Sequence, residues 1–330
     1  MFDRDEKYDL YASRLNGALL GLTAADALGV PVEFRPRAYL DAHPVTDMFG
    51  YGTYNQPPGT WSDDSTMTWC TAESLALQGE CDTEDMAGRF VQWLTKGYMT
   101  PYGELFDIGN ATREALERYR TEAVWARFAG LTHERSNGNG SLMRILPMAF
   151  YVKGMEAGER DRLVAEVSSI THRHPRSILA CRIYTEIALG LLDGQSAEEA
   201  YRSAIAAIGE RHAEHEELAA FERVLGGRMA ELPRDEIRSS GYVVDTLEAA
   251  LWCLLTTGSY REAALTAVNL GEDTDTTAAV AGGLAGILYG EAGIPAEWLS
   301  QLAKLDELRE LSLGFGAMLA KRGKSAKRQS

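Results

Sequence analysis

The stretch 271–290, GEDTDTTAAVAGGLAGILYG, joins a group of acidic residues to a glycine-rich apolar segment. Gly282, Gly286 and Gly290 recur at every fourth position, so they share one face of a helix. Glycine inside a helix costs about 1 kcal/mol relative to alanine, and a glycine face therefore indicates close contact with another helix. The pattern predicts a central helix, with the acidic motif 273–276 at its buried start.

The rest of the chain also has mainly helical periodicity. Leu179, Ile183, Ile187 and Leu191 are spaced four apart, which predicts one buried stripe on a helix. Alternating strand patterns with hairpin turns are nearly absent. The sequence therefore predicts an all-α fold with a dozen or more helices.

Two stretches rich in Gly, Pro or Asn, 41–61 and 130–140, resist helix formation. Long ordered loops in a helical body are often functional. No linker or internal repeat divides the chain, so we expect one domain over 1–320. Residues 321–330 contain five basic residues and no acidic one, and are predicted to be a basic, disordered tail.

The composition limits the classes of function. The net charge of the 330 residues is −15, and without the tail 48 acidic residues face 28 basic ones. Such a body disfavours nonspecific binding to nucleic acid or to an anionic membrane. Four cysteines without CxxC spacing indicate buried thiols in a reducing compartment. Because the first residues are charged and lack a signal-peptide core, we expect a cytoplasmic protein without a membrane partner.

Three acidic motifs point to metal chemistry. They are Glu33, the triplet Ser62-Asp63-Asp64 and the segment Asp273–Thr276. Ionised carboxylate pairs repel one another, so bringing two such pairs together normally requires cations, and all-oxygen ligands select hard ions such as Mg²⁺, Mn²⁺ or Ca²⁺. Helix capping is the alternative, because Ser and Asp are favoured at helix starts. If the pairs converge, they predict a two-metal site.

A second set of polar residues suggests an anion site. The segment 136–140, Ser-Asn-Gly-Asn-Gly, contains residues that permit positive φ, so its backbone N–H groups can converge on a diphosphate. A simple turn is the alternative. His172 and His174 are two apart and lack cysteine partners, which argues against zinc. His172 is either a pocket residue or a structural histidine.

Taken in order, these motifs resemble the ADP-ribosylglycohydrolase family, which includes the dinitrogenase reductase-activating glycohydrolases and the ADP-ribosyl-acceptor hydrolases. The resemblance spans roughly residues 14–290. Its motifs are Gly17–Gly21 with Asp26–Phe34, Trp61–Met67, Gly138–Gly140 with Met143 and Arg144, Thr171–Pro175, Ser240–Leu247 and Asn269–Thr276.

The resemblance implies a single large orthogonal helical bundle with a binuclear Mg²⁺ or Mn²⁺ site. By motif, the metal ligands would be Ser62, Asp63, Asp64, Asp273, Asp275 and Thr276. Glu33 would lie on a mobile loop near the metals, and Glu33, Asp63 or Asp64 would move the catalytic proton. Substrate contacts would come from Ser136, Asn137, Gly138, Asn139, Gly140 and His172, with Tyr242 as an aromatic wall for adenosine.

The chain departs from the family pattern at several positions. Ser62 replaces the usual Thr, which keeps the hydroxyl but removes the methyl that fixes its rotamer. Glu272 replaces a common Gly and is expected to add a carboxylate beside the metals. Arg135 and Asn137 lie in a loop position that varies within the family and touches the acceptor side.

The resemblance implies a metal-dependent hydrolase that cleaves the C1″ glycosidic bond of ADP-ribose on modified protein side chains, with arginine favoured by analogy. One alternative is an immunity protein that neutralises an ADP-ribosylating toxin by hydrolysis or direct binding. About a dozen residues precede the first motif, which favours catalysis over occlusion. Hydrolysis of serine-linked or nucleic-acid-linked ADP-ribose, or a di-metal nucleotide phosphohydrolase, are further alternatives. The expected partner is an ADP-ribosylated protein, and the immunity alternative adds a cognate ADP-ribosyltransferase toxin.

Overall fold

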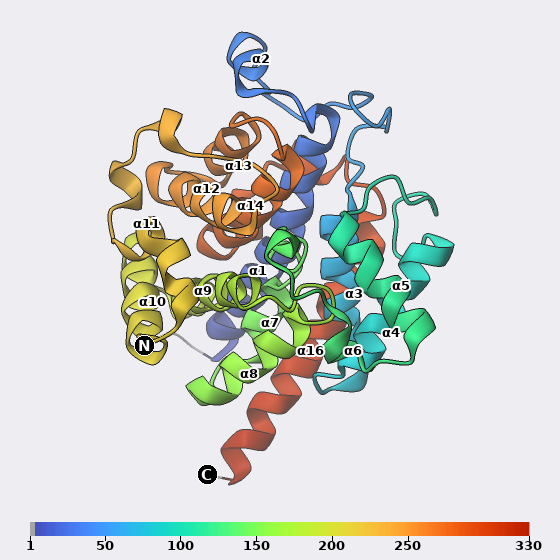
Figure 1. The fold of residues 1–330 in the computed structure, drawn as a ribbon, viewed down its shortest axis with the longest axis vertical. Helices are drawn as coiled ribbons and strands as arrows, with labels where there is room; N and C mark the ends of the chain where they lie inside the picture. The colour runs from blue at the N-terminus through green and yellow to red at the C-terminus, as the bar shows by residue number, and fades with distance from the viewer. Residues whose placement is uncertain (1–3, 330) are drawn as a thin grey trace.

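The computed structural model describes the backbone of residues 4–329 and the side chains of residues 10–323 (Figure 1). Within that range it has sixteen α-helices, six short 3-10 helices and no strand, apart from two isolated β-bridges. The predicted all-α class is therefore confirmed.

The bounds of the α-helices follow in chain order. They are α1 (Arg4–Gly29), α2 (Arg37–Ala42), α3 (Asp63–Gln78), α4 (Thr83–Lys96), α5 (Asn110–Glu122), α6 (Ala126–Ala129), α7 (Leu146–Tyr151), α8 (Ala157–Ser168), α9 (Pro175–Leu192), α10 (Ala197–Arg211), α11 (Glu222–Leu225), α12 (Val243–Thr256), α13 (Tyr260–Val268), α14 (Thr274–Tyr289), α15 (Ala296–Leu299) and α16 (Leu305–Gln329). The 3-10 helices are η1 (Val30–Val32), η2 (Glu134–Ser136), η3 (Glu216–Phe221), η4 (Met229–Glu231), η5 (Arg234–Glu236) and η6 (Glu291–Gly293).

The helices α1 and α14 lie side by side in the middle of the bundle (Figure 1). Their glycines meet: a Cβ built on Gly286 would lie 1.9 Å from the carbonyl oxygen of Gly17, and one on Gly17 would lie 2.2 Å from that of Gly286. The predicted glycine contact is thus present over Gly282 and Gly286. Gly290 instead ends α14 at a φ of 69°, where a residue without Cβ is favoured.

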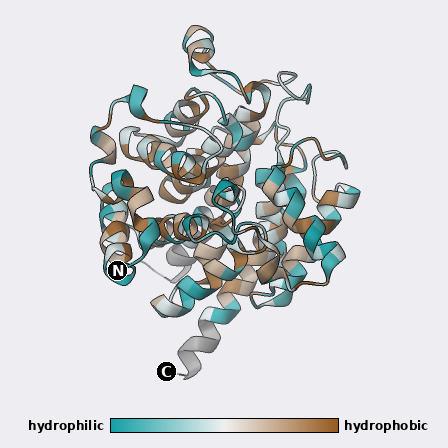
Figure 2. Ribbon diagram, viewed as in Figure 1, coloured by the Kyte–Doolittle hydropathy of each residue, from teal (hydrophilic) through white to brown (hydrophobic). Residues whose placement is uncertain are grey.

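Apolar residues face inward from the surrounding helices, while polar residues cover the outer turns (Figure 2). The stripe Leu179, Ile183, Ile187 and Leu191 is buried on α9, as its spacing predicts. Cys70, Cys181 and Cys253 are buried free thiols, and Cys81 is half-buried.

One helical stretch of the described chain, Leu10–Val32, is long and apolar enough to cross a membrane by length and composition. It forms most of α1, and 94% of its apolar window is buried inside the protein, as in a core helix. Met1–Asp3, part of the charged start, lie outside the described residues.

The expected tail, 321–330, continues α16, whose backbone is helical to Gln329. The expected boundary at residue 320 therefore falls inside a helix rather than at its end. Phe315 and Met318 bury the earlier turns of α16 against the core, and the helix continues outward from them (Figure 1). The division into a domain and a tail stays a prediction.

Candidate active site

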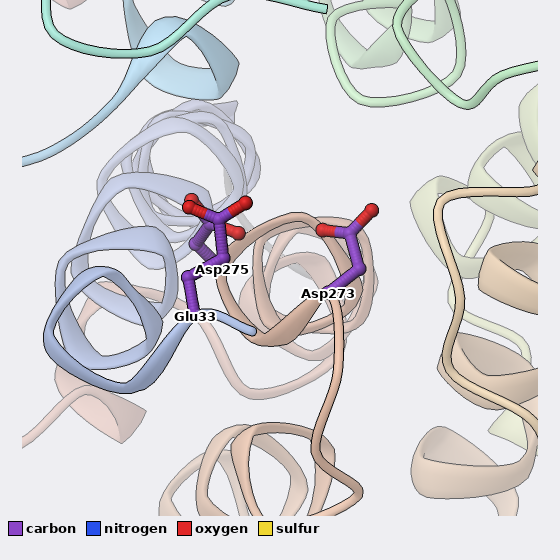
Figure 3. A group of neighbouring side chains, drawn as sticks. All are labelled: Glu33, Asp273 and Asp275. Carbon is purple, nitrogen blue, oxygen red and sulfur yellow. The ribbon is translucent and has the colours of Figure 1, made fainter. Parts of the chain in front are cut away.

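The end of α1 and the start of α14 bring the first and last acidic motifs together. Gly29 lies so close to α14 that a Cβ there would be 2.3 Å from the Cα of Asp275. The Thr274 hydroxyl donates to the carbonyl of Gly29 at 2.8 Å. The chain then leaves α1 through η1, so that Glu33 reaches the start of α14. Carboxylate oxygens of Glu33, Asp273 and Asp275 all lie within 4.8 Å of one another (Figure 3).

The middle motif is positioned by Asp26, a fully buried residue of α1. Its carboxylate accepts hydrogen bonds from the backbone N–H of Ser62, at 3.0 and 3.1 Å, and from that of Ser65, at 3.1 Å. The Ser65 hydroxyl adds a bond of 2.6 Å. Asp26 thus fixes the start of α3 against α1, a role that the sequence analysis did not assign.

The two carboxylate pairs, more than two hundred residues apart in the sequence, meet in one cluster. The Thr276 hydroxyl donates to Oδ2 of Asp64 at 3.2 Å, and the Ser62 hydroxyl donates to the same oxygen at 3.1 Å. Ser62 also caps α3 by accepting from the N–H of Asp64, so the capping interpretation is correct for this residue as well. All six residues expected to bind metal therefore lie at one place in the fold.

Burial and mutual repulsion raise the pKa of these carboxyls. The pKa of Glu33 rises to about 8, chiefly through burial and then through the nearby charge of Asp107. Burial, followed by neighbouring carboxylates, holds the pKa of Asp63, Asp64 and Asp275 well above the usual range. A site that resists negative charge in this way favours either protons or cations.

Three buried carboxylate oxygens in the cluster have no hydrogen-bond partner in the described part of the chain. They are Oε2 of Glu33, Oδ1 of Asp64 and Oδ2 of Asp275. An unpaired buried oxygen of this kind costs free energy, whereas a bound cation would satisfy it. With the surrounding hydroxyls they form an all-oxygen donor set, which fits a hard divalent cation. The cluster can therefore hold metal.

Two residues that the sequence analysis missed complete the cluster. Asp107 hydrogen-bonds to Asp63 and to Tyr54, and Tyr54 also hydrogen-bonds to Glu33. Asp107 comes from a third irregular segment, 97–109, which follows α4. Pro101, Gly103 and Gly109 flank Asp107 in the sequence and are typical of a loop. The sequence analysis did not include this segment among the expected loops.

The segment 136–140, here called the cradle loop, lies beside the acidic cluster. The Asn139 amide donates to Asp273 at 2.8 Å and to the Thr246 hydroxyl at 2.9 Å. Gly138 forms an antiparallel bridge with Tyr242. The structure thus brings the cradle loop and Tyr242 together next to the carboxylates, and Ser136 and Asn137 are buried in it.

The conformation of the cradle loop differs from the expectation. Positive φ was expected, yet none of residues 136–140 has it. The N–H of Asn139 is bonded to the carbonyl of Gly241, at 3.1 Å, because the loop pairs with the segment before α12. Glycine is required at 140 for space instead: a Cβ there would lie 2.8 Å from both the His172 ring and the Thr112 hydroxyl.

His172 is buried against the cradle loop. Its Nδ1 is 2.9 Å from the Thr171 hydroxyl, while its Nε2 is the atom nearest to a Cβ built on Gly138, at 3.6 Å. Burial, and then the charge of Arg144, lower the pKa of His172 to about 3, so the ring is neutral. His174 instead caps α9 by accepting from the N–H of Arg176. The two histidines therefore differ in role: His172 packs against the cradle loop, and His174 caps a helix.

The side chains of Asn137 and Tyr242 have protein partners. Asn137 donates to the carbonyl of Glu134 and accepts from the Ser177 hydroxyl, both at 2.9 Å. The Tyr242 hydroxyl accepts from Arg176 at 3.1 Å. These contacts hold the cradle loop and the neighbouring ring in place.

Glu272 does not add a carboxylate to the cluster, contrary to expectation. Its side chain is exposed, and its charge acts on Arg37. Its φ is 62°, a conformation that favours glycine, which explains in physical terms why glycine suits this position.

Comparisons with known proteins agree with this geometry. The family model described as ADP-ribosylglycohydrolase matches residues 7–327. The chain is 36% identical over 299 residues to "ADP-ribosylarginine hydrolase Tri1" of Pseudomonas putida, covering 91% of this chain and 76% of that protein. It is 32% identical over 312 residues to "ADP-ribosyl-[dinitrogen reductase] glycohydrolase" of Rhodospirillum rubrum, covering 94% and 97%.

A solved structure described as "ADP-ribosylglycohydrolase-related protein complex" superimposes with a TM-score of 0.79 at 32% identity. The match covers 94% of this chain and 99% of that one. The helical bundle, the acidic cluster between α1, α3 and α14, and the similarity along nearly the whole sequence lead to the same conclusion. The chain belongs to the ADP-ribosylglycohydrolase family and is a hydrolase of that class.

Proposed function

We propose that this protein removes ADP-ribose from modified arginine side chains. The observation that carries the proposal is the set of three unpaired buried carboxylate oxygens, on Glu33, Asp64 and Asp275, beside the cradle loop. Two relatives named as ADP-ribosylarginine hydrolases, from Pseudomonas putida and Serratia proteamaculans, support arginine as the acceptor. The partner is then an ADP-ribosylated protein, and the compartment is the cytoplasm.

The proposed cofactor is a pair of Mg²⁺ or Mn²⁺ ions. Ser62, Asp63, Asp64, Asp273, Asp275 and Thr276 would hold them. When bound, such ions neutralise the carboxylates, orient the ribose diol and make a water more acidic. The cradle loop, with His172, would bind the diphosphate, and Tyr242 would line the adenosine end.

The reaction replaces the bond between C1″ and the guanidino nitrogen by a bond between C1″ and a water oxygen. The sugar becomes cation-like as the first bond breaks, and the surrounding carboxylates stabilise that charge. The leaving nitrogen gains one proton, and the water loses one. Glu33, whose pKa is raised to about 8 and which hydrogen-bonds to Tyr54, is placed to hold that proton.

The product identifies the reaction. Arginine-linked and serine-linked ADP-ribosylated peptides are incubated with the protein, with Mg²⁺ or with a chelator, and the products are identified by mass. We expect the arginine-linked peptide to release free ADP-ribose in Mg²⁺ but not in the chelator. AMP with ribose phosphate would instead indicate a phosphohydrolase, and no product would indicate a binding protein. A cognate toxin as partner stays a prediction, tested by mixing the protein with an arginine-directed ADP-ribosyltransferase.

A further inference from the structure

Three aromatic side chains form a continuous group beside the acidic cluster. The ring centroids of Phe34 and Tyr54 are 6.4 Å apart, and those of Tyr54 and Phe106 are 5.0 Å apart. We call this group the aromatic rim. Phe34 is 66% exposed, and the other two rings are half-buried. The rim therefore offers aromatic surface to solvent where the cluster ends.

Each ring of the aromatic rim is next to a carboxylate of the cluster, either in the sequence or through a hydrogen bond. Phe34 follows Glu33 and Phe106 precedes Asp107 in the sequence, while the Tyr54 hydroxyl bonds to both of these carboxylates. The Glu33 side chain is 5% exposed, and its Oε2 has no partner among the described residues. Aromatic faces and a carboxyl oxygen without a hydrogen-bond partner thus occur together.

The backbone holds Phe34 outward in an unfavourable conformation. Its φ is 65°, which costs a residue with a Cβ roughly 1–2 kcal/mol. Its N–H donates to the carbonyl of Glu272 at 2.7 Å, and the N–H of Arg35 donates to that of Val32 at 2.9 Å. The fold therefore fixes an exposed aromatic ring next to a buried carboxylate, at a cost in stability.

The rim and the cradle loop contact different members of the acidic cluster. The cradle loop reaches it through the bond from Asn139 to Asp273, whereas the rim reaches it through Glu33 and Asp107. Oxygens of Glu33, Asp273 and Asp275 lie within 4.8 Å of one another, and Figure 3 shows the Glu33 side chain beside Asp275. A substrate with its diphosphate on the cradle loop and its distal ribose on the cluster would extend its acceptor group toward the rim.

We propose that the aromatic rim is the acceptor subsite and binds the guanidinium of the ADP-ribosylated arginine, an inference that rests on the proposed function. A guanidinium is a flat cation, which stacks on aromatic faces and is attracted to them electrostatically. Carboxyl oxygens of Glu33 and Asp107 lie beside those faces and can accept hydrogen bonds from guanidinium N–H groups. A serine-linked substrate presents a neutral ether oxygen and gains neither interaction.

The test separates the acceptor from the ADP-ribose part of the substrate. Steady-state kinetics with ADP-ribosylarginine as substrate, and inhibition by free ADP-ribose, are measured for the Mg²⁺-loaded protein and its variants. Phe34→Leu keeps an apolar side chain of similar size without the ring, and Phe34→Tyr keeps the ring. Phe106→Leu tests a second ring. Leu313→Ala, which changes a side chain that is 67% exposed on α16, is the control.

We expect Phe34→Leu and Phe106→Leu each to raise KM for ADP-ribosylarginine roughly three- to tenfold, as loss of a cation–π contact predicts. Inhibition by ADP-ribose should not change, because that ligand lacks the guanidinium. Leu313→Ala should resemble the unmodified protein, and Phe34→Tyr, which keeps the ring, should raise KM less than Phe34→Leu does.

Two results would overturn the inference while leaving the proposed function intact: an unchanged KM in both leucine variants, or an equal loss of affinity for ADP-ribose. Hydrolysis of a serine-linked substrate that weakens as much as that of the arginine-linked one would also contradict it. Absence of arginine-linked hydrolysis in the unmodified protein would instead reject the proposed function itself.

Discussion

The helices α1 and α14 contact each other in two chemically opposite ways along their length. In the middle of the pair, Gly17 and Gly286 bring the two backbones together, and the buried Tyr184 hydroxyl donates to the carbonyl of Val280 at 3.0 Å. At the other end, one buried oxygen of Glu33, Oε2, and one of Asp275, Oδ2, have no hydrogen-bond partner among the described residues. The first region is filled by protein atoms, whereas the second presents carboxylate oxygens that a bound cation could satisfy.

The difference teaches that one helix pair can serve two purposes. The glycine contact sets the spacing of the backbones, because no side chain can enter it without displacing a carbonyl. That spacing in turn places Glu33 against Asp275. Substitutions in the two regions should therefore have opposite consequences for stability and activity.

The largest effect on stability is expected at the glycine contact. Gly286→Val would place side-chain atoms against the carbonyl of Gly17, which is 1.9 Å from the position of a Cβ. Overpacking of this kind costs about 1–3 kcal/mol or more, and here the obstacle is backbone, which cannot rotate away. Thermal unfolding followed by circular dichroism should show a large drop in Tm or no folded protein.

Gly314→Ala on α16 is the matched control, because no atom lies within 4 Å of a Cβ at that position. It should leave Tm unchanged or raise it slightly. Equal Tm values for Gly286→Val and the unmodified protein would remove the proposed origin of the helix spacing.

The largest effect on activity is expected at the acidic end. In the unmodified protein, Oδ1 of Asp275 accepts from the N–H of Thr276 at 2.9 Å, and Oδ2 has no partner among the described residues. Asp275→Asn keeps an oxygen for the N–H of Thr276 but removes the carboxylate charge. Hydrolysis should fall by at least about a hundredfold, since a ligand charge is lost. In a chelator, however, the variant should unfold at a higher temperature than the unmodified protein, because one buried repulsive charge is gone. Lower stability together with retained hydrolysis would reverse the comparison.

A smaller effect on affinity is expected in the cradle loop. Gly140→Ala would press a methyl group against His172 and Thr112, each 2.8 Å away, whereas Gly138→Ala meets its nearest atom at an ordinary 3.6 Å. ADP-ribose binding, measured by calorimetry, should weaken roughly tenfold in the first variant and little in the second. The opposite order would show that position 138, rather than position 140, is the one that requires glycine.

The smallest expected effect is a pH dependence of the metal-free protein. The pKa of Glu33 is about 8 in the fold and about 4.3 in an unfolded chain. The folded state therefore binds an extra proton between these values, so its stabilising contribution is lost as pH rises from about 5 to 8. Scanning calorimetry in chelator should show Tm falling over this range, and Mg²⁺ should raise Tm most at pH 8. A Tm that rises with pH in chelator would contradict the raised pKa.

Sequence patterns reached the fold class and the acidic cluster for clear physical reasons. A glycine every fourth residue has few explanations other than close helix contact, and paired carboxylates at helix starts have few explanations other than capping and cation binding. The same patterns did not reveal Asp26, because its role depends on facing the start of α3 across the fold. Asp107 and Tyr54 were missed for a similar reason, since their contacts join three separate loops.

The cradle loop shows where a local pattern was wrong. Asn and Gly at 137–140 permit positive φ, and that conformation was expected. The loop instead pairs with residues at the start of α12 and just before it, through the bonds from the Asn139 N–H to the Gly241 carbonyl and from the Val243 N–H to the Asn137 carbonyl. A nonlocal partner therefore decided the backbone conformation, which sequence spacing does not reveal.

The measurement that tests the central claim most directly is a titration of the chelator-treated protein with Mn²⁺, followed by calorimetry and by the electron paramagnetic resonance of free Mn²⁺. If the acidic end of α1 and α14 is completed by cations, about two ions should bind per chain. Asp275→Asn should bind fewer or bind them much more weakly, while Gly314→Ala binds normally. An unmodified protein that takes up no Mn²⁺, or an Asp275→Asn variant that binds it as well as the unmodified protein, would contradict the account.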